Sequence, residues 1–323
     1  MKIAYLASNR PDFISKITEY TGEAPLMIAA NAEGIYDEAD LARIGDADAL
    51  MVANEPVTEQ LLRACSKVKI VQRFGVGYEK LDLEAAAKLG IPCCNLAGVN
   101  RDAVADHGMA LIAALARNIV PANELTKQVK WGEARMIFSS SIELRGKILG
   151  IFGLGNTGYE LARRARGFGM DVAYNDIREI EAAVVEDVGA RRMEKDEMLA
   201  VSDVVSINVN FNSTAAGMID ARAISLMKPG AYLVCCARGG LIDEQALADA
   251  LNSGRLAGAG IDVFGEEPFP SDNPLLTAKN VVMTPHMAGA SVESSQRNYD
   301  WAYDNVRRVV EKGEKPRFVL NGV

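Results

Sequence analysis

Features that would place this protein among nucleic-acid or membrane proteins are missing from its sequence. The 323 residues contain no run of lysine and arginine, and the formal net charge is −8, which disfavours nucleic acid and anionic membranes as partners. No apolar stretch approaches the roughly 20 residues of a membrane span, and Met1 and Lys2 lead directly into a short strand-like segment. We therefore expect a cytoplasmic protein with neither a membrane nor a nucleic acid as partner.

Cysteine and histidine are scarce as well. The five cysteines form neither a C-x-x-C zinc pattern nor the even-numbered framework of a secreted disulfide protein, so we expect no metal site. They are Cys65, the pair Cys93-Cys94 and the pair Cys235-Cys236. Both pairs lie in apolar runs, which indicates buried, reduced thiols. Because His107 and His286 are the chain's two histidines, any imidazole chemistry must use one of them.

The sequence is organised around a glycine-rich stretch at residues 147–158. An apolar run over Ile148–Phe152 breaks into Gly153, Gly155 and Gly158, which fit the pattern G-x-G-x-x-G. In such a turn the first glycine turns the chain, the second lets a pyrophosphate approach the backbone and the third lets a helix pack on the strand. A helix over residues 159–168 would aim its N-terminal amides at the phosphates, so the stretch predicts a dinucleotide site.

A carboxylate follows the glycine turn at the sequence spacing that a dinucleotide site requires. A second strand, over residues 172–174, leads to Asp176, roughly 20 residues beyond the turn, where the acid that binds the adenosine ribose belongs. A helix N-cap or a solvated loop residue is the alternative interpretation. Asp176 would repel a 2′-phosphate and Arg178 is the nearby cation that could offset this, so NAD is favoured over NADP.

Short apolar runs alternate with helical stretches along the chain, which is the rhythm of parallel sheets covered by helices. The runs cover residues 3–6, 26–30, 49–52, 69–72, 91–94, 204–209, 232–236, 259–262 and 281–284, with helices among others over 58–64, 83–89, 221–227, 244–251 and 292–310. Single cores rarely exceed roughly 250 to 300 residues. We therefore predict two doubly wound α/β domains with a cleft between them: a flavodoxin-like substrate domain of residues 1–98 and 288–323, and a Rossmann NAD-binding domain of residues 99–287.

The segments after the first domain differ in character. Residues 95–100 form a polar crossover suited to a hinge, and residues 102–117 form a helix whose apolar residues nearly encircle it. That helix is therefore either deeply buried or a subunit interface. His107 lies inside it, and we interpret it as a packed or interface residue. Trp131-Gly132 and the serines at 139–141 are expected to belong to a loop.

Three polar side chains follow strands of the predicted second sheet. Arg238 precedes two glycines that leave room for a ligand, Glu267 lies just past a strand end, and His286 follows the last strand. Ligands of open parallel sheets bind outside the carboxyl ends of the strands. Taken singly, Arg238 could be a surface residue that caps a turn and His286 a structural histidine.

Together the three residues match one chemistry. Moving a hydride between a nicotinamide and a 2-hydroxy acid requires a proton to travel to or from the substrate oxygen, and an imidazole titrates near neutral pH. A carboxylate partner orients the imidazole and favours its protonated form. An arginine grips a carboxylate with two prongs and polarises the carbonyl, so the substrate must be anionic.

These motifs resemble the D-isomer-specific 2-hydroxyacid dehydrogenase family over nearly the whole chain. The resemblance is carried by Arg73-Phe74-Gly75-Val76-Gly77, Val104-Ala105-Asp106-His107, Gly153 to Gly158, Cys236-Ala237-Arg238-Gly239-Gly240, Asp262-Val263-Phe264 through Glu267-Pro268, and Pro285-His286. It implies Arg238 as the substrate-binding residue, Glu267 as the partner of the histidine and His286 as the acid/base. It also implies a dimer through the helix of residues 102–117.

The resemblance also implies a set of contact residues. For the cofactor these are Asn156 and Thr157 at the pyrophosphate, Asp262 at the nicotinamide amide, and further Val209, Asn210, Cys236, Ala237 and Gly289. For the substrate carboxylate they are Gly75, Val76 and Gly77, with Asn100 beside them.

The chain departs from the family pattern at two places. It has Asn208-Val209-Asn210 where the family often has His-x-Pro, and Asp106 where a glutamate is usual. Formate dehydrogenases of the same fold carry glutamine in place of the acid, so Glu267 argues against that activity.

The choice between a phosphorylated and an unphosphorylated substrate depends on how few lysines and arginines could bind a phosphate. The loop at residues 53–56 reads Ala-Asn-Glu-Pro, which leaves Arg73 as a thin phosphate site, and the chain ends at Val323 without the regulatory domain of some phosphoglycerate enzymes. We therefore favour a small unphosphorylated acid such as glyoxylate or hydroxypyruvate. A D-3-phosphoglycerate dehydrogenase-like enzyme, or an NAD-sensing binding module or corepressor of this fold, is the alternative.

Overall fold

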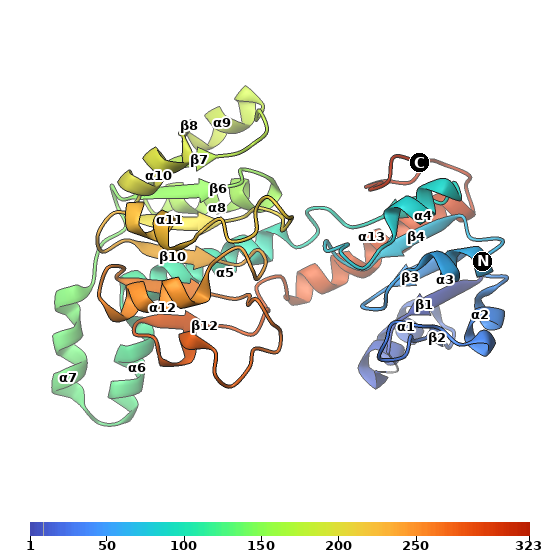
Figure 1. Cartoon of the computed structure of the whole chain (residues 1–323), viewed down its shortest axis with the longest axis horizontal. Coiled ribbons are helices and arrows are strands. Elements are labelled where there is room, and N and C mark those ends of the chain that lie inside the picture. Colours follow the sequence, from blue (N-terminus) through green and yellow to red (C-terminus); the bar gives the residue numbers. More distant parts are fainter. Residues whose placement is uncertain (9) are drawn as a thin grey trace. The chain divides into compact units, whose positions relative to one another are not determined.

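The computed structural model describes residues 1–8 and 10–323. They form two compact units, one of Met1–Asn100 with Ser291–Val323 and the other of Arg101–Ala290. Each unit is a parallel sheet with helices packed around it (Figure 1), so the predicted α/β class with two sheet domains is confirmed.

The sheet of the first unit has the strand order β2-β1-β3-β4-β5, the flavodoxin-like order, and all its strands run parallel. The strands are β1 (Ile3–Leu6), β2 (Leu26–Ile28), β3 (Ala49–Val52), β4 (Ile70–Arg73) and β5 (Cys93–Cys94). Residues of β3 are buried throughout. A strand covered on both faces must be apolar at every position, which is why the sequence shows runs here and no alternation.

In the described part of this unit the helices that cover the sheet are α1 (Pro11–Thr21), α2 (Glu38–Ile44), α3 (Glu59–Ala64), α4 (Leu83–Lys88) and α13 (Val292–Val310). Side chains of Asp37, Thr58 and Asp82 accept the third amide of the helices that follow them. The last helix belongs to the first unit, where the hydroxyls of Tyr303 and Tyr5 lie 2.6 Å apart.

The sheet of the second unit has the order β12-β11-β10-β9-β6-β7-β8, again all parallel. Its strands are β6 (Ile148–Phe152), β7 (Asp171–Asn175), β8 (Ala190–Arg192), β9 (Val204–Ile207), β10 (Tyr232–Cys235), β11 (Gly258–Ile261) and β12 (Val281–Met283). The order reverses between β6 and β9. In a doubly wound sheet this reversal is where a dinucleotide binds.

The helices of the second unit are α5 (Arg101–Ala116), α6 (Ile119–Lys127), α7 (Trp131–Met136), α8 (Asn156–Gly167), α9 (Ala182–Val188), α10 (Lys195–Val201), α11 (Ala221–Leu226) and α12 (Glu244–Asn252), with 3₁₀ turns at Ile137–Ser140 and Pro274–Thr277. Helix α5 packs against α8, β10 and β11 and buries side chains such as Met109, Leu111 and Ile112. Of the two interpretations of this helix, deep burial or a subunit interface, the single chain shows burial of its apolar residues.

No single helix of the described residues is long and apolar enough to cross a membrane. Helices α5 and α6 reach that length only as a pair bent by 64°.

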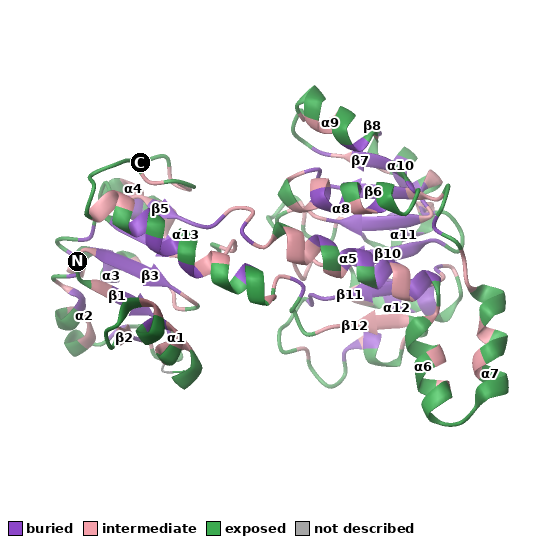
Figure 2. Cartoon of the chain, turned by 180° about the vertical axis from the view of Figure 1, so that it is seen from behind, coloured by how far each residue is buried: buried purple, intermediate pink, exposed green. Residues whose placement is uncertain are grey.

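The expectation of a loop at Trp131-Gly132 and at residues 139–141 is wrong for all of these residues except Ser141, which follows the last helical turn. Residues 131–136 form α7, a 3₁₀ turn follows, and α6 precedes them although no helix was predicted there. Neither helix buries a residue (Figure 2). Neither therefore presents a stripe of apolar residues to a core, which is the pattern by which a helix is recognised in a sequence. Large apolar side chains stand exposed on this hairpin, among them Val129, Trp131, Met136 and Phe138.

Candidate active site

The glycine turn joins β6 to α8. Gly153 adopts a left-handed conformation with φ of 86°, and a Cβ on it would lie 2.8 Å from the carbonyl oxygen of Asn208, just past β9. A Cβ on Gly158 would overlap the carbonyl oxygen of Gly153. Only glycine satisfies both positions, because the first needs a positive φ and the second a backbone-to-backbone approach.

The start of α8 is open in the way that a pyrophosphate requires. Gly155 is the N-cap and provides no side chain for the first amides, which begin at Asn156 and Thr157. Asn156 is exposed and Thr157 is half-buried. A Cβ on Gly155 would meet only Arg178 Nη2, at 3.5 Å, so the backbone is accessible from that side. The turn therefore fits a pyrophosphate held by uncapped amides.

A methyl group at Gly158 tests this turn. We expect Gly158→Ala to weaken NADH binding and to destabilise the protein by about 1 to 3 kcal/mol, because the turn must open to relieve the overlap. The matched control is Gly167→Ala on the same helix, where a Cβ meets nothing within 4 Å. Thermal unfolding and NADH titration of both variants check the prediction, and equal behaviour of the two would contradict it.

Asp176 follows β7, as predicted, and lies against the turn. It is 8% exposed, and its Oδ2 accepts the amide of Leu154 at 3.0 Å. Burial alone would raise the pKa of Asp176, but hydrogen bonds from Arg178 and from backbone amides outweigh it, so the pKa lies below its ordinary value. A carboxylate is thus held ionised beside the glycine turn.

The end of β9 borders the same turn. Val209 Cγ1 would lie 3.0 Å from a Cβ on Gly153, and Asn210 is exposed. Asn208, which stands where the family often has histidine, donates through Nδ2 to Ser206 Oγ of β9 at 3.1 Å. Its side chain is thus hydrogen-bonded to the strand that it follows. Contacts of Val209 and Asn210 with the cofactor stay predictions.

Topology gathers the three polar candidates at one edge of the sheet. Strands β10, β11 and β12 are neighbours, with Cys235 opposite Ile261 and Ile261 opposite Met283. Arg238 follows β10 by three residues and His286 follows β12 by three. Because all strands run parallel, their carboxyl ends share one edge.

His286 and Glu267 form a direct pair. His286 Nδ1 lies 2.6 Å from Glu267 Oε2, and both side chains are partly exposed, at 47% and 34%. Glu267 Oε1 accepts the amide of Phe264 at 2.9 Å, which fixes the carboxylate. His286 itself adopts φ of 51°, an uncommon conformation for a residue with a Cβ. The structure therefore orients the ring through Nδ1 and leaves Nε2 for another partner.

Asp262 anchors the histidine loop. It is fully buried, and its Oδ1 accepts the amide of Met287 at 3.0 Å while its Oδ2 accepts the amide of Ala288 at 2.8 Å. The hydroxyl of Thr284 also donates to Oδ1, at 2.5 Å, and lies 3.0 Å from His107 Nε2. Thr284 was not singled out from the sequence. His107 is half-buried and its ring contacts Thr284, and its interpretation as a packed or interface residue stays a prediction. The predicted contact of Asp262 with the nicotinamide stays a prediction.

The loop after β10 is tightly confined. A Cβ on Gly239 would overlap the carbonyl oxygen of Phe264, and Arg238 Nη1 donates to Ala237 O at 2.8 Å. Cys236, Ala237 and Arg238 are all half-buried, as is Gly289. Glycine at 239 thus lets the arginine loop pass directly beside the loop that carries Glu267.

The cysteines are free, and the prediction of buried thiols in the two pairs is confirmed for Cys93, Cys94 and Cys235, whereas Cys236 is half-buried. Burial raises the pKa of Cys65, Cys93 and Cys94 to about 12 and that of Cys235 to about 11. These thiols are therefore protonated and unreactive at neutral pH.

The predicted substrate loop belongs to the first unit and follows β4. Gly75 has φ of 108°, and Asn95 Nδ2 donates to Val76 O at 2.8 Å. Gly77 and Asn100 are half-buried. The buried Asn95 therefore fixes the loop conformation, and the roles of these residues in substrate binding stay predictions.

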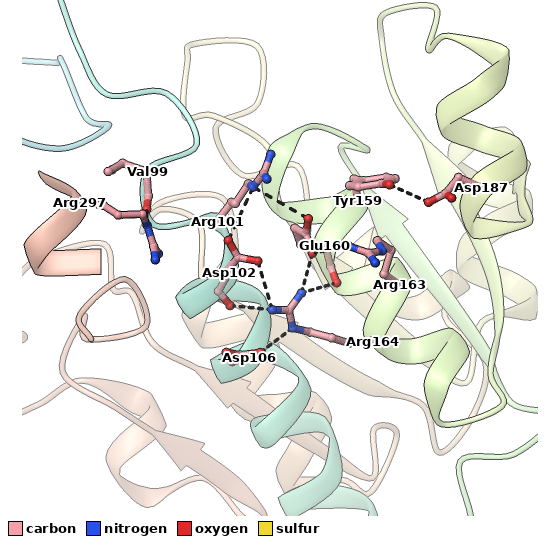
Figure 3. Close-up of polar contacts among 10 residues, drawn as sticks. All are labelled: Val99, Arg101, Asp102, Asp106, Tyr159, Glu160, Arg163, Arg164, Asp187 and Arg297. Atoms are coloured by element: carbon pink, nitrogen blue, oxygen red, sulfur yellow. Dashed lines mark hydrogen bonds and ion pairs between the residues drawn. The ribbon is translucent and has the colours of Figure 1, made fainter. Parts of the chain in front are cut away.

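A polar cluster ties α5 to α8 (Figure 3). Arg164 of α8 donates through Nε to Asp106 at 2.5 Å, through Nη1 to Glu160 at 2.8 Å and through Nη2 to Asp102 at 3.4 Å. Glu160 is buried, and Arg163 at 3.6 Å joins Arg164 in pairing with its carboxylate. Asp106, shorter than the usual glutamate, still reaches Arg164. The cluster holds the helix whose N-terminus forms the glycine turn.

Comparison with known proteins agrees with this geometry. The model of the family described as "D-isomer specific 2-hydroxyacid dehydrogenase, NAD binding domain" matches residues 109–288. The chain is 36% identical to a glyoxylate reductase of Korarchaeum cryptofilum, over 87% of this chain and 85% of that protein. It is 38% identical to a D-3-phosphoglycerate dehydrogenase of Methanocaldococcus jannaschii, over 95% of this chain and 57% of that protein, so it spans little more than half the length of that relative.

Among solved structures, the apo form of D-mandelate dehydrogenase from Rhodotorula graminis matches with a TM-score of 0.88 at 26% identity, covering 100% of this chain and 98% of that one. A Rossmann sheet with an open glycine turn and a histidine–carboxylate pair at its edge is typical of nicotinamide-dependent dehydrogenases. The chain belongs to the D-isomer specific 2-hydroxyacid dehydrogenase family. The predictions of the family and of an NAD-dependent enzyme are thereby confirmed.

Proposed function

We propose that this protein reduces a small unphosphorylated 2-keto acid, such as glyoxylate or hydroxypyruvate, to the 2-hydroxy acid with NADH. The observation that carries the proposal is the 2.6 Å pair of His286 and Glu267 at the strand edge that also presents Arg238. Resemblance to a glyoxylate reductase over 85% of that protein supports the substrate class.

NADH, held by the glycine turn and Asp176, would supply the hydride for reduction of the keto carbon. The imidazolium of His286 donates the proton from Nε2 to the keto oxygen, which becomes the hydroxyl, while Nδ1–H remains on Glu267. Arg238 binds the substrate carboxylate with its fork and stabilises charge that develops on the oxygen. In the oxidative direction His286 takes the proton back.

A phosphorylated substrate is the second candidate, and one contact favours it. Lys80 Nζ donates to the carbonyl of Asn54 at 3.0 Å, which brings a cation to the loop that reads as cation-free in the sequence. Arg73 at the end of β4 is a second cation of the same unit. These two charges and the phosphoglycerate relative are compatible with a phosphate on the substrate.

A substrate panel separates the candidates. We expect glyoxylate and hydroxypyruvate to give a higher kcat/KM for NADH oxidation than phosphohydroxypyruvate, and Lys80→Ala to leave the first two unchanged. A preference for the phosphorylated acid that Lys80→Ala abolishes would establish the second candidate. Tight NADH binding without turnover of any acid would indicate an NAD-sensing module.

Glu267→Gln tests the positioning of the histidine. Loss of a charge-assisted hydrogen bond, about 1.5 to 3 kcal/mol, predicts a kcat lower by roughly 10- to 150-fold with little change in KM. An unchanged kcat in this variant would show that Glu267 does not act on His286.

We also propose that the protein is a cytoplasmic homodimer that buries the α6–α7 hairpin together with the exposed face of α5. Free cysteines that are buried or half-buried agree with a reducing compartment. The hairpin follows α5 directly and exposes large apolar side chains, Trp131 by 66% and Phe138 by 72%, which an interface between two copies would cover.

Sedimentation tests the dimer. We expect the wild type to sediment at twice the 34.7 kDa chain mass, and Trp131→Asp with Phe138→Asp to sediment at the chain mass. The control is Val292→Asp, an 84% exposed valine at the start of α13. A hairpin variant that stays dimeric would refute this surface.

A further inference from the structure

Asp176 already has a partner that competes with a ribose. Its Oδ1 accepts from Arg178 N at 2.9 Å and from Arg178 Nε at 3.2 Å, and its Oδ2 accepts from Arg178 Nη2 at 3.1 Å. Both oxygens of the carboxylate are therefore engaged by one guanidinium. A ribose hydroxyl that donates to Asp176 has to displace at least part of this fork.

The position of Arg178 lies on the cofactor's path. Its Nη2 is 3.5 Å from the point where a Cβ on Gly155 would stand, so the guanidinium extends over the glycine turn. Its side chain is nevertheless 63% exposed, whereas that of Asp176 is 5% exposed. The guanidinium therefore has room to turn towards a ligand, while the buried carboxylate is fixed in place by the amide of Leu154.

A second arginine reaches the same strand end from β8. Arg192, paired with Tyr174 of β7, donates through Nη2 to the backbone carbonyl of Asp176 at 3.1 Å. The sequence pattern shows no strand at residues 190–192, so this cation was missed. Two guanidiniums and one carboxylate thus meet where the adenosine ribose would lie.

From this arrangement we propose that Arg178 sets cofactor selectivity: it moves from Asp176 onto a 2′-phosphate, with Arg192 as the second cation, so that the site accepts NADPH as well as NADH. This inference rests on the proposed role of Asp176 as the ribose acceptor. A lone carboxylate repels a 2′-phosphate, whereas two guanidiniums beside the carboxylate offset that repulsion, and the planar fork of each matches phosphate oxygens.

Equilibrium binding, free of catalysis, tests the proposal. Calorimetric titration with NADH, NADPH and 2′,5′-ADP is compared for wild type, Arg178→Ala, Arg192→Ala and Asp176→Ala. The control is Arg222→Ala, which removes an arginine equally exposed, at 66%, from an ion pair with Asp196 on α10. We expect Arg178→Ala to weaken NADPH and 2′,5′-ADP by roughly tenfold or more, the effect of one charge-assisted hydrogen bond, and to leave NADH equal or tighter. Raised salt should weaken 2′,5′-ADP binding in wild type and much less in this variant.

Two results would overturn the proposal: wild type that binds neither NADPH nor 2′,5′-ADP, or Arg178→Ala that changes NADH and NADPH alike. The role of Asp176 is judged separately. Asp176→Ala should weaken NADH, and an unchanged NADH affinity in that variant would refute the ribose assignment, whereas the 2′,5′-ADP comparison would still decide on Arg178.

Discussion

Replacing His286 with glutamine should lower kcat for keto acid reduction by about 10²- to 10⁴-fold, the contribution of a positioned general acid. Glutamine retains a polar side chain but cannot deliver a proton from Nε2. Affinity for NADH should change little, because the glycine turn and Asp176 lie at other strand ends of the sheet. Steady-state NADH oxidation and a separate NADH titration measure the two effects.

The chain's other histidine provides the comparison. His107 lies 3.0 Å from Thr284 Oγ1 and can act on the loop only through that hydroxyl. We expect His107→Gln to lower kcat by less than about tenfold, the range of a single neutral hydrogen bond. If His107→Gln were the more damaging variant, the assignment of the acid would be reversed.

Arg238→Met should lower kcat/KM by about 2 to 5 kcal/mol, or roughly 30- to 5,000-fold, since it removes the charge that pairs with the substrate carboxylate. Arg238→Lys should recover only part of this loss, because an ammonium keeps the charge but cannot form the planar fork. Rates over a range of keto acid concentrations, at saturating NADH, measure both variants.

The specificity of this effect can be checked with an uncharged substrate. Arg238→Met should lose much less activity towards a keto amide than towards the keto acid, because the amide never used the ionic contact. An equal loss for the two substrates would mean that Arg238 supports the fold of its loop and does not bind carboxylate. Arg222→Met, which removes a guanidinium on α11, should leave both rates unchanged.

The predictable parts of this protein are those where backbone geometry admits few residues. The turn at Gly153 and Gly158 was readable because the positive φ and the contact between backbone atoms each demand glycine. Buried parallel strands were readable as apolar runs because helices cover both faces of each sheet, so successive residues must all be apolar. The pair of His286 and Glu267 was readable as polar residues at strand ends, with the family resemblance supplying the pairing.

Elements without burial escaped prediction. Helices α6 and α7 bury no residue and β8 is a three-residue edge strand of Ala-Arg-Arg, so none carries a periodic apolar pattern. Side-chain partners brought together by the fold were missed with them. Thr284 on Asp262, Arg192 at the end of β7 and Lys80 at Asn54 are each joined to a partner at least 16 positions away in the chain.

The most direct test of the account is a single-turnover experiment in which enzyme saturated with NADH is mixed with hydroxypyruvate. Decay of the reduced nicotinamide absorbance with formation of one D-glycerate per NADH, much slower in His286→Gln at equal NADH occupancy, is the predicted result. Bound NADH that stays reduced in the wild type, or decay at the same rate in both proteins, would contradict the account.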